Sequence, residues 1–114
     1  MLVTLLKSKI HRAVVTGSSL NYAGSISLPP SWLRKAGILE FEKVLVADLD
    51  NGGRFETYAI AGREGEVTLN GATARLGQPG DRVIIMAWGA FEPAEAAGFR
   101  PRIVLVDENN RAGD

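Results

Sequence analysis

The residues with the most specific chemistry lie at the peptide bond between Gly24 and Ser25. Glycine has no Cβ, so it can adopt backbone angles closed to other residues and leaves its carbonyl open to attack. The hydroxyl of Ser25 can add to that carbonyl and convert the amide into an ester. β-Elimination of the ester leaves dehydroalanine, and hydrolysis turns this into a pyruvoyl group with loss of ammonia. Most Gly-Ser pairs are ordinary loops, so this prediction depends on the surrounding sequence.

Cleavage at this bond would divide the chain into residues 1–24, the β-chain, and residues 25–114, the α-chain. The uncut polypeptide would then be a zymogen that activates itself. The new ketone at position 25 would be a covalent pyruvoyl cofactor. Such a ketone forms a Schiff base with an amine substrate and acts as an electron sink, which no ordinary side chain does.

Short strands and turns must hold this bond in place. Alternating apolar and polar residues predict strands, and Gly, Pro and Asn mark the turns between them. A short helix is expected between Pro30 and Gly37, because proline suits a first turn and glycine ends helices. One helical turn is expected at 93–97, and this pattern alone predicts a small, mainly β barrel. Strands are expected at 2–6, 9–16, 25–28, 43–49, 54–61, 67–69, 82–88 and 102–107.

Two of these strands place candidate site residues on defined faces. Lys9 and His11 point the same way, about 7 Å apart, because side chains alternate along a strand. Arg54 and Tyr58 likewise share a face, whereas Thr57 lies on the opposite one. Arg54 could bind a carboxylate through two parallel hydrogen bonds, and Lys9 could add a second positive charge. These two cations suit an amino-dicarboxylate substrate, and His11 is a candidate contact to the substrate or the cleavage site.

Composition limits the classes of protein to which the chain can belong. Its 114 residues predict a single domain with a polar tail at 108–114, and 46% of them are hydrophobic. Thirteen basic residues balance thirteen acidic ones, so the chain lacks the positive excess of most nucleic-acid-binding proteins. The absence of cysteine excludes disulfides and thiolate nucleophiles, and a single histidine makes a metal site improbable.

The hydropathy pattern predicts a cytoplasmic protein that does not enter a membrane. The apolar opening, Met1–Leu6, is only six residues long and has no basic region before it, so we interpret it as a strand rather than a signal peptide. No stretch approaches the roughly 20 apolar residues of a membrane-spanning helix.

Four motifs together resemble the pyruvoyl-dependent aspartate 1-decarboxylases. The similarity extends from about residue 1 to about residue 106, with the motifs in the order and spacing of that family. The resemblance implies a six-stranded double-psi β-barrel with short helices, assembled as a homotetramer with sites at subunit interfaces. It also implies a lyase that converts L-aspartate to β-alanine and CO2 for pantothenate biosynthesis. The motifs are Lys9–Ala13, Leu20–Ile26, Asn51–Tyr58 and Leu69–Ala72.

The resemblance also assigns roles to residues. Ser25 is the precursor of the pyruvoyl group and forms the Schiff base after autocatalytic cleavage from Gly24. Tyr58 is the proton donor. Thr57 binds substrate, which requires either a bulge or a site between subunits, because Thr57 and Tyr58 alternate on one strand. Substrate is also bound by the bend of small residues comprising Gly71, Ala72 and Thr73. The family usually has alanine at the position of Thr73.

Two alternatives remain open. Residues 28–38 followed by 43–46 also resemble the swapped-hairpin transcription regulators that bind DNA as dimers, although the balanced charge and the four motifs weigh against this. The second alternative is a related decarboxylase that acts on glutamate, since one methylene changes binding in a pocket by only about 1–3 kcal/mol. Pro29-Pro30, Arg34-Lys35 and Ala47-Asp48 depart from the usual family pattern.

Overall fold

A long N-terminal strand organises the fold of residues 1–113, which the computed structural model describes. This strand, β1 (Val3–Val14), has twelve residues and pairs antiparallel with β7 (Arg82–Phe91) on one side and parallel with β8 (Arg102–Leu105) on the other. The remaining strands are β2 (Gly17–Ser19), β3 (Ser25–Leu28), β4 (Lys43–Asp48), β5 (Arg54–Ala61) and β6 (Thr68–Asn70). Three short helices complete the chain: α1 (Pro30–Ala36), the 3-10 helix η1 (Gly71–Arg75) and α2 (Pro93–Ala96).

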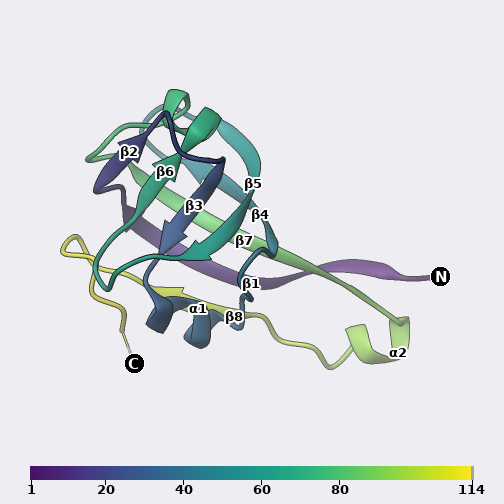
Figure 1. Ribbon diagram of the computed structural model, residues 1–114. Coiled ribbons are helices and arrows are strands. Elements are labelled where there is room, and N and C mark those ends of the chain that lie inside the picture. The colour runs from purple at the N-terminus through teal and green to yellow at the C-terminus, as the bar shows by residue number, and fades with distance from the viewer. Residues whose placement is uncertain (114) are drawn as a thin grey trace.

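The eight strands form one mixed sheet in the order β2-β6-β3-β5-β4-β7-β1-β8 (Figure 1). β1 and β2 follow each other directly in the chain, yet they stand near opposite ends of this order. Between them, the Val15 N–H donates to the Asp81 carbonyl at 2.8 Å, and the Thr16 N–H donates to the Val67 carbonyl at 2.8 Å. One continuous segment therefore pairs with both halves of the sheet.

Alternation along the strands separates a buried face from an outer one. Most of the inward side chains are aliphatic and buried, as expected for strands that cover a common core. Outward side chains of β1, β4, β5, β7 and β8 are partly or fully exposed. The largest fully buried side chains include Ile10, Ile26, Leu28, Leu69 and Ile85.

Helix α1 lies against the sheet below β3 and β1 in Figure 1. Pro30 stands in its first turn, and Trp32, Leu33 and Ala36 are its buried residues. The helix ends at Gly37, whose φ of 69° lies in the left-handed region that favours glycine. The expectation of a short helix between Pro30 and Gly37 is confirmed.

The mainly β class with short helices is confirmed, and the strand arrangement is consistent with a double-psi barrel. The two N-terminal strands expected at 2–6 and 9–16 form one strand. β1 shifts its register against β7 between Leu6 and Ser8 but continues without a break. Gly17–Ser19 is a short strand rather than a turn, and the bend expected after Asn70 is the 3-10 helix η1. Among residues 1–113, no helix is long and apolar enough to cross a membrane.

Candidate functional site

Ser25 is the first residue of β3 and is only 1% exposed, whereas the preceding Gly24 is exposed. The side-chain amide of Asn70 donates from Nδ2 to Ser25 Oγ at 2.8 Å. This contact follows from the antiparallel register of β3 with β6, which pairs Ser25 with Asn70. The hydroxyl next to the candidate cleavage bond is thus shielded from solvent and held by a neutral donor.

The segment that follows β6 packs directly on the candidate cleavage bond. Gly71 is buried with φ +63°, and a Cβ at this position would lie 2.8 Å from Gly24 Cα, so a side chain here would displace the bond. Thr73 is buried, and its hydroxyl lies 2.7 Å from the Asn70 carbonyl and 3.3 Å from the Ser25 carbonyl. Ala72 lies between them and is exposed. The structure thus brings Gly71 and Thr73 beside the Gly24–Ser25 bond, while their binding of substrate stays a prediction.

Asn70 is the site residue that sequence reasoning missed. Locally, the Asn70-Gly71 pair indicates only a tight bend, because this dipeptide is a strong turn signal. Its burial to 3% exposed and its contact with Ser25 arise from pairing between strands 45 residues apart. Only its place in the Leu69–Ala72 motif, one of the four that carry the resemblance, could have pointed to Asn70.

Tyr58 stands beside the start of β3. β3 and β5 run parallel, with Ile26 paired to Ala59, so continuing this register by one residue places Tyr58 level with Ser25. The ring of Tyr58 also lies 6.4 Å from that of Phe41, between centroids. Tyr58 is therefore positioned by a strand that is hydrogen-bonded to the strand carrying Ser25.

Thr57 and Tyr58 keep the alternation of an ideal strand. The β4–β5 register runs without interruption from Lys43 opposite Tyr58 to Ala47 opposite Arg54, so β5 contains no bulge against β4. Of the two explanations that the sequence left open, this favours a site between subunits, in which opposite faces of one strand can serve different copies.

Lys9, His11 and Arg54 lie on the outer face of the sheet, and not beside one another. The register places Arg54 and His11 in one row that crosses β5, β4, β7 and β1, and Lys9 in the adjacent row. Three strand intervals separate Arg54 from His11, or about 14 Å along the sheet. We call the two rows the outer rows; they comprise Arg54, Ala47, Ile84, His11 and Leu105, and Glu56, Leu45, Met86, Lys9 and Ile103.

Burial lowers the pKa of His11 below its usual range, and the nearby charges of Lys9 and Arg12 lower it further. Its Nδ1 atom is buried and has no hydrogen-bond partner within residues 1–113. The imidazole is therefore neutral at pH 7 and presents itself as a hydrogen-bonding group rather than a cation. Of Lys9 and His11, Lys9 is the residue that supplies a positive charge.

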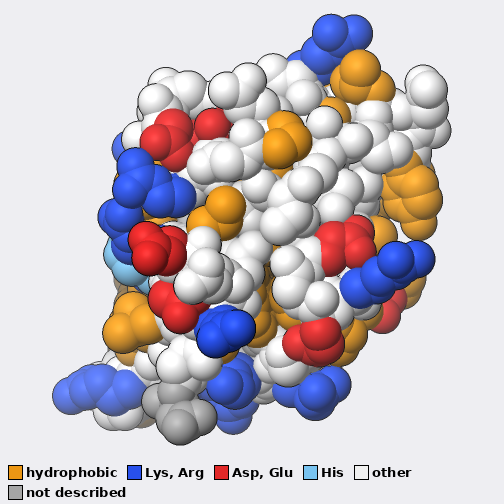
Figure 2. Space-filling view, turned by 90° about the vertical axis from the view of Figure 1, so that its left-hand side faces the viewer, with side chains coloured by type: hydrophobic (Ala, Val, Ile, Leu, Met, Phe, Trp, Pro, Cys, Tyr) orange, Lys and Arg blue, Asp and Glu red, His pale blue; other side chains and the backbone are white. Residues whose placement is uncertain are grey.

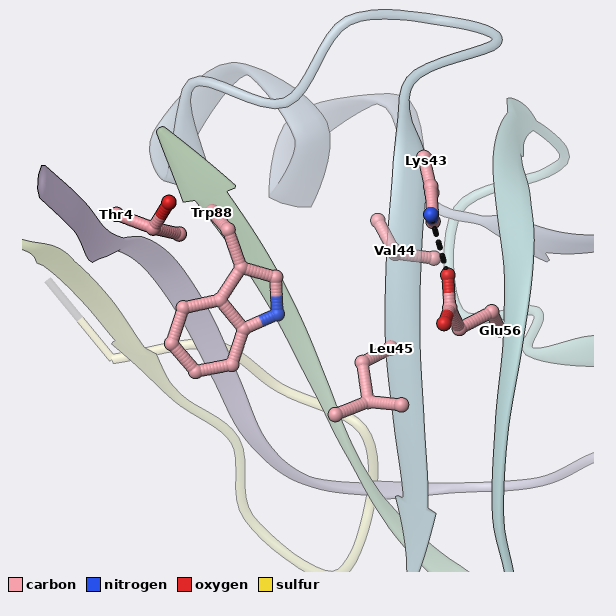
Figure 3. A pocket seen from close by; sticks show the side chains of 6 residues that line it. All are labelled: Thr4, Lys43, Val44, Leu45, Glu56 and Trp88. Atoms are coloured by element: carbon pink, nitrogen blue, oxygen red, sulfur yellow. Dashed lines mark ion pairs between the residues drawn. The ribbon is translucent and has the colours of Figure 1, made fainter. Parts of the chain in front are cut away.

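A groove opens between β1, β4, β5 and β7, with a volume of about 310 Å³. Figure 3 shows the indole of Trp88 turned across it and the carboxylate of Glu56 paired with Lys43, at 2.6 Å. Thr4, Val44 and Leu45 complete its lining. The groove adjoins the outer rows, and its one ion pair leaves no unpaired charge among the six lining side chains.

Three carboxylates meet at the opposite end of β4, where Asp48, Asp50 and Asp81 bring ligand atoms within 4.8 Å of one another. Asp50 is already engaged, since its two oxygens accept hydrogen bonds from the backbone and the guanidinium of Arg82. Burial raises the pKa of Asp48, and its contact with the Asp81 carboxyl raises it further. Asp48 Oδ2 lacks a hydrogen-bond partner within the described chain, and a proton held between it and the nearby Asp81 carboxyl would satisfy it.

Charges of both signs are interspersed on the face of the molecule drawn in Figure 2, which carries the exposed loops to the left in Figure 1. This distribution does not resemble the one-sided basic surface that binding to duplex DNA requires. It gives no support to the DNA-binding alternative.

Comparison with known proteins gives a consistent result. The family model for aspartate decarboxylase matches residues 1–113. An aspartate 1-decarboxylase of Campylobacter jejuni subsp. doylei is 58% identical over 98% of this chain and 90% of its own length. Enzymes of the same name from Lactiplantibacillus plantarum and Clostridium botulinum are 54% and 52% identical, over 97% and 96% of this chain and 87% and 88% of their own lengths.

Proposed function

The chain belongs to the aspartate decarboxylase family, and from this premise we propose that it makes its own pyruvoyl group from Ser25. Its reaction is the decarboxylation of L-aspartate to β-alanine and CO2, and family membership places the product on the route to pantothenate. The observation that carries the proposal is the Ser25 hydroxyl, buried directly after the exposed Gly24 and held by Asn70. A cytoplasmic location stays a prediction.

The residues around Ser25 fit a group of this kind. The hydroxyl that must attack the Gly24 carbonyl accepts a hydrogen bond from a neutral amide, so its own proton remains free to leave. Gly71 packs against the backbone of Gly24 without a side chain, and this keeps the bond accessible within a tight bend. The hydroxyl of Thr73 reaches the Ser25 carbonyl, which becomes the amide carbonyl next to the new ketone.

When present, the pyruvoyl group supplies an electron sink for the carbon that loses CO2. The protein must then bind two carboxylates and deliver one proton. Arg54, which is exposed on the outer face of β5, supplies a guanidinium suited to one carboxylate. Tyr58, level with Ser25, supplies a phenolic proton. Thr57 and the backbone of the Gly71–Thr73 segment bind the substrate beside it.

In a homotetramer, residues that lie far apart on one chain can meet in one site formed by two copies. Lys9 and His11 lie about 14 Å along the sheet from Arg54, farther than one small substrate can bridge. The outer rows also expose apolar side chains from three strands, β4, β7 and β8, which a second copy would cover. We therefore place Lys9 and His11 in the site of a neighbouring subunit.

Intact-mass spectrometry of the purified protein tests the self-processing directly. We expect two masses, for residues 1–24 and for residues 25–114 beginning with a pyruvoyl group. Ser25→Ala should remain a single chain of 12.2 kDa and form no β-alanine, with its thermal unfolding otherwise near that of the wild type. A wild-type protein that stays uncut and decarboxylates aspartate at the same rate as a cleaved sample would exclude the pyruvoyl mechanism.

A further inference from the structure

The side-chain amide of Asn70 makes two hydrogen bonds to hydroxyls of β3. Its Nδ2 donates to Ser25 Oγ at 2.8 Å and to Ser27 Oγ at 2.9 Å. An amide nitrogen carries two hydrogens, so these contacts use both of them. Ser25 and Ser27 point to the same face of β3 because they are two residues apart. The second hydroxyl has no part in the chemistry of the cleavage bond.

The hydroxyl of Ser27 is available as a hydrogen-bond acceptor for Asn70. Its residue is 7% exposed, so solvent does not compete effectively for the contact. Thr68, which stands opposite Ser27 in the β3–β6 register, turns its own hydroxyl to Glu66 Oε1 at 2.8 Å. Thr73 holds the other end of Asn70 by donating to its backbone carbonyl at 2.7 Å. Asn70 is thus held at its backbone carbonyl by Thr73 and at its side-chain amide by Ser27.

We propose that Ser27 is a positioning residue for self-cleavage, whose hydroxyl holds the Asn70 amide so that it donates to Ser25 Oγ. The proposal rests on the proposed function. The terminal torsion of an asparagine side chain is broad, so a single hydrogen bond leaves the amide free to rotate. A second acceptor at Ser27 restricts that rotation and keeps the nitrogen, rather than the carbonyl oxygen, against Ser25.

The orientation of this donor matters because Ser25 Oγ takes part in both steps, first as the attacking atom and then as the leaving atom. In the first step Oγ bonds to the Gly24 carbonyl carbon, the carbon–nitrogen bond breaks, and the hydroxyl proton ends on the freed nitrogen of Ser25. In the second step Ser25 loses its Cα proton, and its Cβ–Oγ bond breaks with the electron pair leaving on Oγ as the Gly24 carboxylate. Water then replaces the nitrogen, which departs as ammonia. A donor fixed at Oγ holds the hydroxyl in place for the first step and stabilises the carboxylate that leaves in the second.

The experiment follows cleavage from the moment the chain is made, by pulse–chase in cell-free translation with intact-mass detection. The variants are Ser27→Ala, Asn70→Ala and the double variant. We expect Ser27→Ala to slow cleavage about 3- to 10-fold, the range of one net hydrogen bond, while its unfolding temperature stays close to that of Ser25→Ala. Ser27→Cys keeps the volume but accepts hydrogen bonds weakly, so it should also be slow, and it replaces Ser27→Ala if that variant does not fold.

The double variant separates positioning from a general packing effect. If Ser27 acts through Asn70, adding Ser27→Ala to Asn70→Ala should leave the cleavage rate unchanged. Equal rates for Ser27→Ala and the wild type, or multiplicative slowing in the double variant, would overturn the inference. Both of those results leave self-cleavage itself intact, whereas a wild type that never cleaves overturns the proposed function instead.

Discussion

At the scale of single residues, Tyr58 separates the two chemical tasks of the chain. Its register beside Ser25 suits proton delivery during turnover, whereas Asn70 already contacts the hydroxyl that drives cleavage. Phenylalanine keeps the ring and its packing against Phe41 and removes only the proton. We expect Tyr58→Phe to cleave into both pieces but to form β-alanine at least about 100-fold more slowly. The measurements are intact mass and product formation; normal turnover by the cleaved variant would return Tyr58 to a packing role.

Arg54 offers a second prediction at this scale. It is exposed, and no residue in the described range 1–113 forms an ion pair with it. Arg54→Ala should therefore leave the unfolding temperature nearly unchanged. Loss of a charge-assisted hydrogen bond should lower kcat/KM for aspartate at least about tenfold. Arg63→Ala, an exposed arginine beyond the end of β5, is the matched control and should keep full activity. A marked loss of stability in Arg54→Ala, with activity per folded molecule preserved, would identify a structural role.

At the scale of elements, local patterns predicted the strands whose polar and apolar residues alternate. The expected strand at 54–61 coincides with β5, and the helix between Pro30 and Gly37 coincides with α1. The sequence did not predict β2, because three small polar residues show no alternation and their pairing with β6 is long-range. The role of Asn70 depends on the same kind of pairing, which no local pattern reveals. The chemistry of a Gly-Ser bond pointed to Ser25, whereas the roles of Thr57 and Tyr58 came from the resemblance to a family, and alternation supplied only their faces.

The end of β4 provides a prediction on pH. Burial and the Asp81 carboxyl raise the folded-state pKa of Asp48 above its ordinary value of 3.8, so folding favours the protonated form. Its stabilising contribution is complete below pH 3.8 and is lost as the pH rises through the folded-state pKa. Asp48→Asn donates to Asp81 at every pH. We therefore expect its unfolding temperature to exceed that of the wild type at neutral pH, by a margin that disappears in acid.

Asp50→Asn is a control for which stability should depend on pH in the opposite direction. Hydrogen bonds from the Arg82 side chain and backbone lower the pKa of Asp50, so its contribution is present above pH 3.8 and is lost as the pH falls. This variant should be less stable than the wild type at neutral pH and equal to it in strong acid. If Asp48→Asn instead loses stability at neutral pH, or if the wild type gains stability from divalent cations, the shared proton is the wrong account of this pair.

At the scale of the whole molecule, the outer face of the sheet is the proposed contact between copies. Trp88 is 46% exposed at the groove that adjoins the outer rows, so replacing it costs a single subunit little. Trp88→Glu would place a charge in the proposed contact between copies, where it would be desolvated without a partner. We expect its mass by light scattering to fall below that of the wild-type tetramer. Leu39→Glu, at a site 74% exposed after α1, should leave the mass unchanged. Retention of the tetramer by both variants would place the contact elsewhere.

Because β1 and β2 lie on one continuous segment before Gly24, self-cleavage would make folding an association of two polypeptides. The proposed cleavage after Gly24 would leave both strands on the short piece, which would still pair with β7, β8 and β6 but would no longer be joined to them covalently. Each mature subunit is then a complex of two polypeptides, and its unfolding includes a dissociation. Its stability follows mass action and declines on dilution, which is not so for the uncut chain. Refolding requires the two pieces to meet again in solution, so the lifetime of the mature enzyme is governed by how slowly the short piece escapes.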